Sequence, residues 1–249
     1  MTDPLIIARR DAGLELTLNR PDCRNALSGE LIARLREEVC AAASDPDVRT
    51  ILITGTPPAF CAGLDLREVA RTGESEAAHD TSVLLDLYET LDACTKPIIA
   101  AVNGAAVAGG AGLVCVCDVV ICGAAAQFGY PGIRHGLVAP IVMPYLVNVV
   151  GHRRARYLLL TGEMLSATQT VSWGLADELT RDDELLGRAR TIAARLAGYQ
   201  PRALASAKTL LRQLQDLRGE SSRGMLRHLA RSVPLTDDTR EGLRRFLEP

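Results

Sequence analysis

The chain has few aromatic residues, almost no net charge and no long apolar run. Aromatics make up 4% of its 249 residues, so its core must be built from Ala, Leu, Val and Ile. A formal net charge of -2 gives no electrostatic reason to expect nucleic acid as a partner. The most apolar tract, residues 98–122, is interrupted by Asn103, several glycines and Asp118. A membrane-spanning helix needs ~20 predominantly apolar residues, so we expect no membrane partner either.

The cysteines do not form a pattern that indicates disulfides or a metal site. There are seven of them, and Cys115 and Cys117 are spaced more closely than zinc ligands usually are, without a histidine nearby. We therefore expect no bound metal and interpret the cysteines as small apolar residues in a reducing compartment. No basic segment followed by an apolar stretch opens the chain, which predicts no signal peptide and a cytoplasmic protein.

Strand and helix signals alternate in the first part of the chain, and helix signals dominate after about residue 141. Ser28 is predicted to be an N-cap, and Ser166 with Gln169 fits a capping box. Residues 71–80 are polar and aperiodic, so we expect a mobile loop there. This order predicts an α/β core with an α-helical C-terminal part. The expected strands are 5–10 and 14–18 (a hairpin), 50–54, 98–102, 119–122 and 127–128, and long helices are expected from 184, 202 and 237.

Two glycine-containing loops follow predicted buried strands, at residues 60–66 and 103–113. Glycine lets the backbone approach a ligand closely, and unpaired N–H groups there can hold a developing oxyanion. Tight packing of a helix on a strand is the alternative interpretation. The spacing matches neither a dinucleotide-binding fingerprint nor a phosphate-binding P-loop.

An ordered set of short motifs resembles the enoyl-CoA hydratase/isomerase (crotonase) family. The motifs are Asn-Arg-Pro at 19–21, Asn-Ala-Leu at 25–27, Phe-Cys-Ala-Gly-Leu-Asp-Leu at 60–66, Thr-Lys-Pro-Ile-Ile-Ala-Ala-Val-Asn-Gly at 95–104, Cys-Asp-Val-Val at 117–120, Ala-Gln-Phe-Gly-Tyr-Pro at 126–131, Leu-Thr-Gly at 160–162, Ser-Ala at 166–167 and Trp-Gly-Leu-Ala at 173–176. The resemblance implies a crotonase-like spiral of ββα units. It places the core and the acyl-CoA site in residues 1–195 and a helical trimerisation part in 196–249. It also implies a homotrimer or dimer of trimers, with coenzyme A entering as part of a thioester substrate and no permanently bound cofactor.

The resemblance assigns roles to particular residues. Two backbone N–H groups, those of Leu64 and Gly109, would bind the thioester oxygen. The CoA adenine and phosphates would be surrounded by Arg24, Ala62, Leu64, Asp65, Leu66 and Arg67. Arginine is chemically suited to phosphate, although Arg24 and Arg67 also fit an interpretation as ordinary solvated side chains.

The chain departs from family hydratases at two positions where they carry glutamate, which here are Gly112 and Gly132. Positioned acid–base groups contribute ~10²–10⁴-fold to such reactions, and glycine supplies none, so ordinary hydration is not expected. His135 is the first candidate for a replacement, since histidine titrates near neutral pH; a hydrogen-bonded core histidine is the alternative. Weaker candidates are His79, Asp80, Tyr130 and Tyr145.

Three functions stay open from the sequence. The first is an enzyme that stabilises a CoA-thioester enolate for isomerisation, decarboxylation or C–C cleavage. The second is an enoyl-CoA hydratase with relocated acid–base groups. The third is a pseudoenzyme that binds acyl-CoA without turning it over. A proton-transfer group within reach of the thioester α-carbon separates the enzymes from the binding protein.

Overall fold

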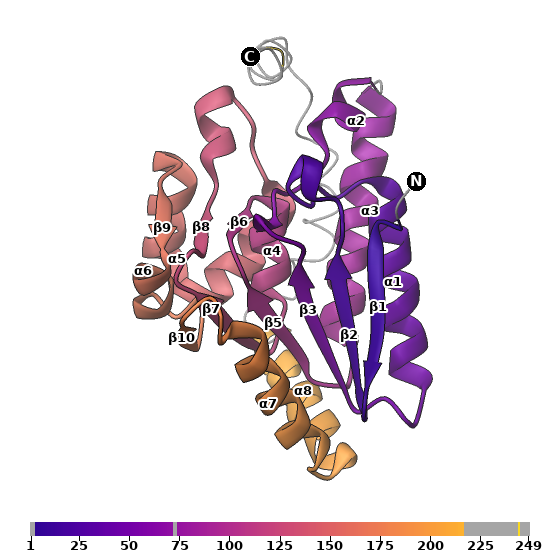
Figure 1. The fold of residues 1–249 in the computed structure, drawn as a ribbon. Coiled ribbons are helices and arrows are strands. Elements are labelled where there is room, and N and C mark those ends of the chain that lie inside the picture. Colours follow the sequence, from indigo (N-terminus) through magenta and orange to yellow (C-terminus); the bar gives the residue numbers. More distant parts are fainter. Residues whose placement is uncertain (1–2, 72–73, 217–243, 245–249) are drawn as a thin grey trace.

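The computed structural model describes residues 3–71, 74–216 and 244, and Figure 1 shows the arrangement of their helices and strands. The strands are β1 (Leu5–Arg10), β2 (Gly13–Leu18), β3 (Thr50–Gly55), β4 (Ala59–Cys61), β5 (Ile98–Val102), β6 (Ala105–Val107), β7 (Val119–Gly123), β8 (Gln127–Gly129), β9 (Met164–Ser166) and β10 (Glu178–Thr180). The helices are α1 (Gly29–Ser44), α2 (Leu66–Arg71), α3 (Glu74–Ala93), α4 (Gly109–Cys115), α5 (Met143–Thr161), α6 (Ala167–Ser172), α7 (Leu185–Ala197) and α8 (Pro201–Asp216), with 3-10 turns η1 (Pro21–Cys23), η2 (Pro131–His135) and η3 (Pro140–Val142). None of the described helices combines the length and apolarity needed to cross a bilayer.

The strands form two sheets that share a repeating connection. The larger sheet has the order β1-β2-β3-β5-β7-β10 and the smaller has the order β4-β6-β8-β9. Three successive strand pairs, β3/β4, β5/β6 and β7/β8, each give their first strand to the larger sheet and their second to the smaller one. A helical segment follows each pair before the chain returns to the larger sheet or, after the third pair, to β9. The predicted spiral of ββα units is confirmed by this topology (Figure 1).

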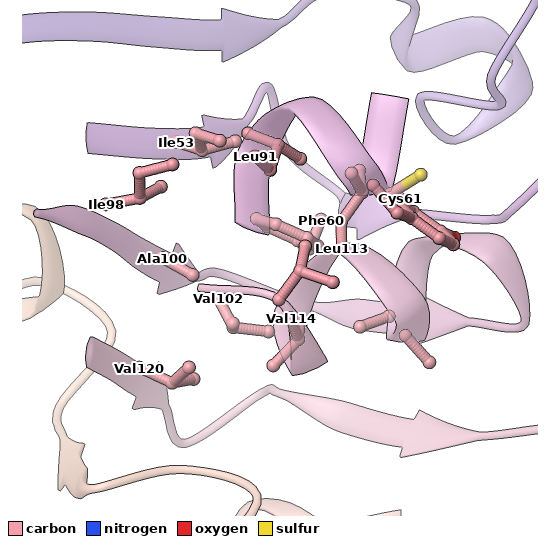
Figure 2. Packing of buried hydrophobic residues seen from close by; sticks show 14 of the residues in the cluster. Ile53, Phe60, Cys61, Leu91, Ile98, Ala100, Val102, Leu113, Val114 and Val120 are labelled. Atoms are coloured by element: carbon pink, nitrogen blue, oxygen red, sulfur yellow. The ribbon is translucent and has the colours of Figure 1, made fainter. Parts of the chain in front are cut away.

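The core is filled by small and branched aliphatic side chains, as the shortage of aromatics requires. Every residue of β3 and β5 is buried, as is typical of parallel strands covered on both faces. Alternate residues of β3 and β5 point to opposite faces. Figure 2 shows Ile53, Ile98 and Ala100 pointing toward Leu91 of α3 and Leu113 of α4. Leu52, Ile99 and Ala101 form a second cluster with the buried face of α7.

Several local predictions are confirmed. β1 and β2 pair as the expected antiparallel hairpin, with Leu5 opposite Leu18. Ser28 is the N-cap of α1, and its hydroxyl accepts a hydrogen bond from the Leu31 N–H at 3.2 Å. The capping box of Ser166 and Gln169 is present at the start of α6. The two capping signals are local, because each joins residues three apart, and sequence patterns reveal them for that reason.

One prediction along the chain is wrong, and another lies almost wholly outside the described residues. The loop expected at residues 71–80 is wrong, since α2 includes Arg71 and α3 already begins at Glu74. Glutamate and alanine in this segment favour a helix even without an apolar stripe. The helices expected from 184 and 202 are confirmed as α7 and α8, whereas the helix expected from 237 lies almost wholly outside the described residues. The division at residue 195 stays a prediction.

A buried carboxylate on β2 fixes α7 to the larger sheet. Glu15 is 7% exposed, and its two oxygens accept hydrogen bonds from Arg190 of α7, both at 2.9 Å. Arg10 donates a third, from Nε at 3.0 Å. Burial raises the pKa of Glu15, but the hydrogen bonds and charges of Arg190 and Arg10 outweigh it and hold the pKa below its ordinary value of 4.5. The ion pair therefore stabilises the fold above that pH and loses this contribution as the pH falls toward the lowered pKa.

Replacing Arg190 with methionine should lower the free energy of unfolding by about 2 kcal/mol at pH 7. Breaking a buried pair costs roughly 3–5 kcal/mol, and we reduce this because Arg190 is partly exposed and Arg10 remains. Denaturant unfolding measures the difference, which should shrink as the pH falls below 4.5, the ordinary pKa of this carboxyl, toward its lowered pKa in the folded state. Arg188→Met is the matched control, because Arg188 makes the same two-fold contact with the more exposed Glu178 and should change stability little. Equal effects of the two substitutions would contradict this account.

Candidate active site

The first glycine-containing loop runs from β4 into α2 and is held by the segment before α1. The Leu27 N–H donates to the Gly63 carbonyl at 2.7 Å, and the Asp65 N–H donates to the Leu27 carbonyl at 3.0 Å. In this parallel bridge the N–H of Leu64 points away from Leu27. Within residues 3–71 and 74–216 it has no hydrogen-bond acceptor. The fold thus leaves one backbone donor of this loop available.

The second loop connects β6 to α4 through a strained residue. Ala108 has φ +48° and ψ -110°, a conformation that residues with a side chain rarely adopt. Its N–H donates to the Gly129 carbonyl at 3.0 Å, which holds the loop against the end of β8. Strain of this kind costs of order 1–3 kcal/mol and clusters at functional sites. The next N–H, that of Gly109, has no acceptor in the described part of the chain.

The two loops lie against each other, so the two free donors are neighbours. A Cβ atom on Gly63 would lie 3.0 Å from the Gly109 nitrogen, and one on Gly109 would lie 3.5 Å from the Leu64 nitrogen. A Cβ on Gly110 would lie 2.2 Å from the Cys61 carbonyl oxygen. Only glycine allows this approach at Gly110. Two N–H groups this close can donate to a single ligand oxygen.

Gly112 and Gly132, where the resemblance leads us to expect glutamate in a hydratase, have different surroundings. A Cβ on Gly112 would lie 2.3 Å from the Tyr88 hydroxyl oxygen and 2.7 Å from a methyl group of Val142. A Cβ on Gly132 would meet the Leu137 Cβ at 3.2 Å, a contact that a small shift relieves. The first position is therefore filled by a tyrosine from α3, while the second is nearly open.

Tyr88 is a site residue that the sequence did not single out. It is 0% exposed, its hydroxyl donates to the Gly109 carbonyl at 2.5 Å, and its ring packs edge-to-face on Tyr145 with 5.5 Å between centroids. Burial, together with the nearby Cys61 and Cys115, raises the pKa of Tyr88 well above its ordinary value of 10. Tyr88 is thus a hydrogen-bond donor rather than a base. The available signal was a tyrosine spaced four residues from Leu84 and three from Leu91, as on one face of a helix, since a buried tyrosine hydroxyl requires a partner.

The other polar groups beneath the loops are also neutral. Burial raises the pKa of the Cys61 and Cys115 thiols to about 12, so neither is a thiolate at neutral pH. Tyr130 is buried and directly precedes η2, and its hydroxyl lies close to the Cys115 thiol. Among the residues that the structure describes, this interior therefore offers hydroxyl donors and no charged nucleophile.

The residues expected to surround CoA lie along one edge of the first loop. The Ala62 N–H donates to the carbonyl of Arg24, whose side chain is exposed, and Arg67 is exposed at the start of α2. Asp65 is buried and ion-paired with Arg20 at 2.8 Å, and its other oxygen accepts from the Arg67 N–H at 3.1 Å. The Asp65 carboxylate thus anchors the loop. Leu66 is the first residue of α2.

The carboxylate of Glu68 lines a small cavity beside Leu64. The volume of this cavity is about 10 Å³, room for roughly one water molecule. The lining includes Asp65, which is ion-paired, and Glu68, whose Oε2 accepts a hydrogen bond from the Gly29 N–H at 3.1 Å. Glu68 was not among the candidate residues predicted from the sequence.

His135, the first candidate for the missing acid or base, is the last residue of η2 and is partly buried. η2 starts two residues after Gly129, whose carbonyl holds Ala108, so its first residues lie next to the second loop. The role of His135 stays a prediction. His79 and Asp80 lie in the first half of α3, where only the backbone is described.

Comparisons with known proteins agree with this fold. A family model described as enoyl-CoA hydratase/isomerase matches residues 9–249. The 2,3-dehydroadipyl-CoA hydratase of Escherichia coli (strain K12) is 37% identical over 250 residues, covering 98% of this chain and 95% of that protein. A putative enoyl-CoA hydratase of Thermus thermophilus is 37% identical over 235 residues, covering 93% and 92%.

A solved structure extends the agreement to three dimensions. It is a putative enoyl-CoA hydratase/isomerase (crotonase) from Legionella pneumophila, with a TM-score of 0.82 and 30% identity. The superposition covers 99% of this chain and 97% of that one. The chain belongs to the enoyl-CoA hydratase/isomerase family.

Proposed function

We propose that the chain binds a CoA thioester and stabilises the enolate of its acyl group with the N–H groups of Leu64 and Gly109. The observation that carries this proposal is that these two donors have no acceptor among residues 3–71 and 74–216 and lie side by side. When a bond to the α-carbon breaks, negative charge moves onto the thioester oxygen. A single donor aimed at such an oxygen is worth roughly 2.7–4 kcal/mol in the transition state.

The proposed reaction is not ordinary hydration. Water addition needs one group to activate water and another to protonate the α-carbon, and Gly112 and Gly132 supply neither. Decarboxylation of a malonyl-type thioester avoids this requirement. When CO₂ leaves, the electrons of the broken C–C bond remain on the α-carbon and form the enolate without a base. Isomerisation needs one group that moves a proton, for which Glu68 and His135 are the candidates.

Two alternatives retain specific support. A hydratase with relocated acid–base groups is favoured by the names of the relatives in Escherichia coli and Thermus thermophilus. Glu68 and His135 would then divide the roles of base and acid. A protein that only binds acyl-CoA is favoured by the neutral interior around Tyr88 and Cys115.

Product analysis separates these functions. Three thioesters are each incubated with the protein and analysed by mass spectrometry and NMR. They are crotonyl-CoA, its isomer with the double bond one carbon further from the thioester carbonyl, and malonyl-CoA. We expect isomerised or decarboxylated product and little 3-hydroxyacyl-CoA. Rapid formation of 3-hydroxybutyryl-CoA would favour the hydratase instead. Where a product forms, Glu68→Gln and His135→Ala show which side chain moves the proton.

The exposed arginines at the loop edge should contribute to CoA binding. Replacing Arg24 or Arg67 with alanine removes a cation suited to phosphate, and we expect each change to raise the Kd for a CoA thioester about tenfold, or ~1.4 kcal/mol. Isothermal titration at two salt concentrations measures this, with a smaller salt dependence in the variants. Arg36→Ala, which removes an exposed arginine from α1, is the control. Unchanged Kd values in all three variants would remove Arg24 and Arg67 from the site.

The assembly into a homotrimer or dimer of trimers is also a proposal. It is supported by large apolar side chains exposed on two helices, α5 and α8, which a partner subunit would cover. They are Leu160 on α5 and Leu210 and Leu211 on α8.

A further inference from the structure

The hydroxyl group of Tyr88 lies in the space that a side chain at position 112 would fill. A Cβ on Gly112 would lie 2.3 Å from this oxygen, and the hydroxyl donates to the Gly109 carbonyl at 2.5 Å. Leu84, one turn earlier on α3, closes the other side, because its methyl group would lie 3.2 Å from a Cβ on Gly109. Because Gly112 has no side chain, there is room for the Tyr88 hydroxyl. This hydroxyl contacts Gly109, the residue that carries the second N–H donor of the proposed site.

The backbone around Gly109 needs such a contact. Gly109 and Gly110 have no side chains to fix their peptide planes, and Ala108 before them is strained. The Gly129 carbonyl holds the Ala108 N–H on one side of Gly109. The Tyr88 hydroxyl holds the Gly109 carbonyl on the other side. The peptide that presents the Gly109 N–H therefore lies between two peptides that are each held by a hydrogen bond.

We propose that Tyr88 is a positioning residue of this oxyanion site, which takes over the space of the missing glutamate and orients the Gly109 N–H toward the thioester oxygen. This inference rests on the proposed function of Leu64 and Gly109. Tyr88 acts through the backbone, because its hydroxyl is already bound to Gly109 and its side chain is fully buried. The Tyr88 hydroxyl can occupy its place only because position 112 is a glycine, and it fills the space that this glycine leaves.

The test reads the polarisation of the thioester carbonyl, which does not depend on turnover. Acetyl-CoA and butyryl-CoA labelled with ¹³C at the thioester carbon are bound to the full-length protein, and the ¹³C shift is compared with that of the free thioester. Hydrogen bonds to the carbonyl oxygen displace this signal downfield. We expect Tyr88→Phe to lose a large part of the displacement while the Kd changes less than about twofold, the pattern of a lost orienting contact. Any deuterium entry at the α-carbon should slow by roughly 10–100-fold, since small misplacements have effects of this size.

Tyr157→Phe is the matched control, because it removes the same atom from an exposed tyrosine whose hydroxyl donates to Glu163 at 2.6 Å. It should leave the ¹³C displacement unchanged. If Tyr88→Phe keeps the full displacement, the role of Tyr88 is overturned and the proposed function stands. If the thioesters fail to bind the wild type, or bind without displacement, the proposed function itself fails.

A second variant covers the case in which Tyr88→Phe does not fold. Genetic incorporation of 3-fluorotyrosine at position 88 keeps the ring and makes the hydroxyl a stronger donor. The ¹³C displacement should then change relative to the wild type, with little change in Kd. An unaltered displacement would count against Tyr88.

Discussion

Replacing Gly110 with alanine should separate the two loops and abolish enolate stabilisation. The new Cβ would lie 2.2 Å from the Cys61 carbonyl oxygen and 2.7 Å from the Cys61 Cβ, so backbone has to move. Overpacking usually costs ~1–3 kcal/mol, and a contact this short with backbone should cost about 3 kcal/mol or more. A shift of even 1 Å in a catalytic group can reduce rates ~10²-fold. Denaturant unfolding and deuterium entry at the α-carbon measure the two effects.

Gly187→Ala is the matched control, and we expect it to raise the stability that Gly110→Ala lowers. Gly187 is exposed within α7, and a Cβ there would meet nothing within 4 Å. Alanine is a better helix former than glycine, so this variant should gain roughly 0.5–1 kcal/mol in stability and keep its activity. If Gly110→Ala were as stable and active as Gly187→Ala, the close approach of the two loops would have no functional role.

Restoring glutamate at position 112 should destabilise the protein without producing a hydratase. The Tyr88 hydroxyl and a Val142 methyl group occupy the place of its first side-chain atoms, at 2.3 and 2.7 Å from a Cβ. We expect Gly112→Glu to lower the free energy of unfolding by about 3 kcal/mol or more, through overpacking and burial of a carboxylate. Gly132→Glu should cost only about 1 kcal/mol, since it meets the Leu137 Cβ at 3.2 Å. Thermal unfolding and crotonyl-CoA hydration assays compare the two.

A variant with combined substitutions tests whether Tyr88 is what excludes a glutamate at position 112. Tyr88→Ala provides the space that the glutamate at position 112 lacks, so we expect the triple variant with Gly112→Glu and Gly132→Glu to hydrate crotonyl-CoA faster than either single glutamate variant. A stable Gly112→Glu protein that hydrates crotonyl-CoA by itself would contradict the steric account of Tyr88.

Family membership fixes the fold and supports a CoA thioester as ligand, but not the reaction. The same fold hosts different chemistries, and the reaction depends on the side chains at the site. Two relatives named as hydratases are each 37% identical to this chain, whereas Gly112 and Gly132 of this chain supply no acid or base. The chemistry of this chain therefore has to be established from its own residues.

The sequence predicted the features that depend on nearby residues. Ser28 and the Ser166–Gln169 pair were recognisable because capping joins residues three apart. The buried β5 strand was recognisable as a short apolar run. Short strands such as β9 and β10 were missed, because three residues carry too little pattern and depend on their partners in the sheet.

The candidate site was predictable only in its backbone. The glycines of both loops marked where the chain needs close approach, and the resemblance connected Leu64 with Gly109. Tyr88 was missed because its contact with Gly109 spans 21 residues. The pairing of Arg20 with Asp65 spans 45 residues and was missed for the same reason. Contacts between residues this far apart follow from the fold and not from local spacing.

The central claim is that Leu64 and Gly109 stabilise an enolate although the hydratase glutamates are absent. Mass spectrometry of butyryl-CoA and malonyl-CoA incubated with the protein in D₂O tests it most directly, because either exchange or decarboxylation places deuterium on the α-carbon. We predict deuterium in at least one thioester with the wild type and none above background with Gly110→Ala. If both thioesters bind to the wild type and return without deuterium and with their carbon skeletons intact, the account is contradicted and the chain is an acyl-CoA-binding protein.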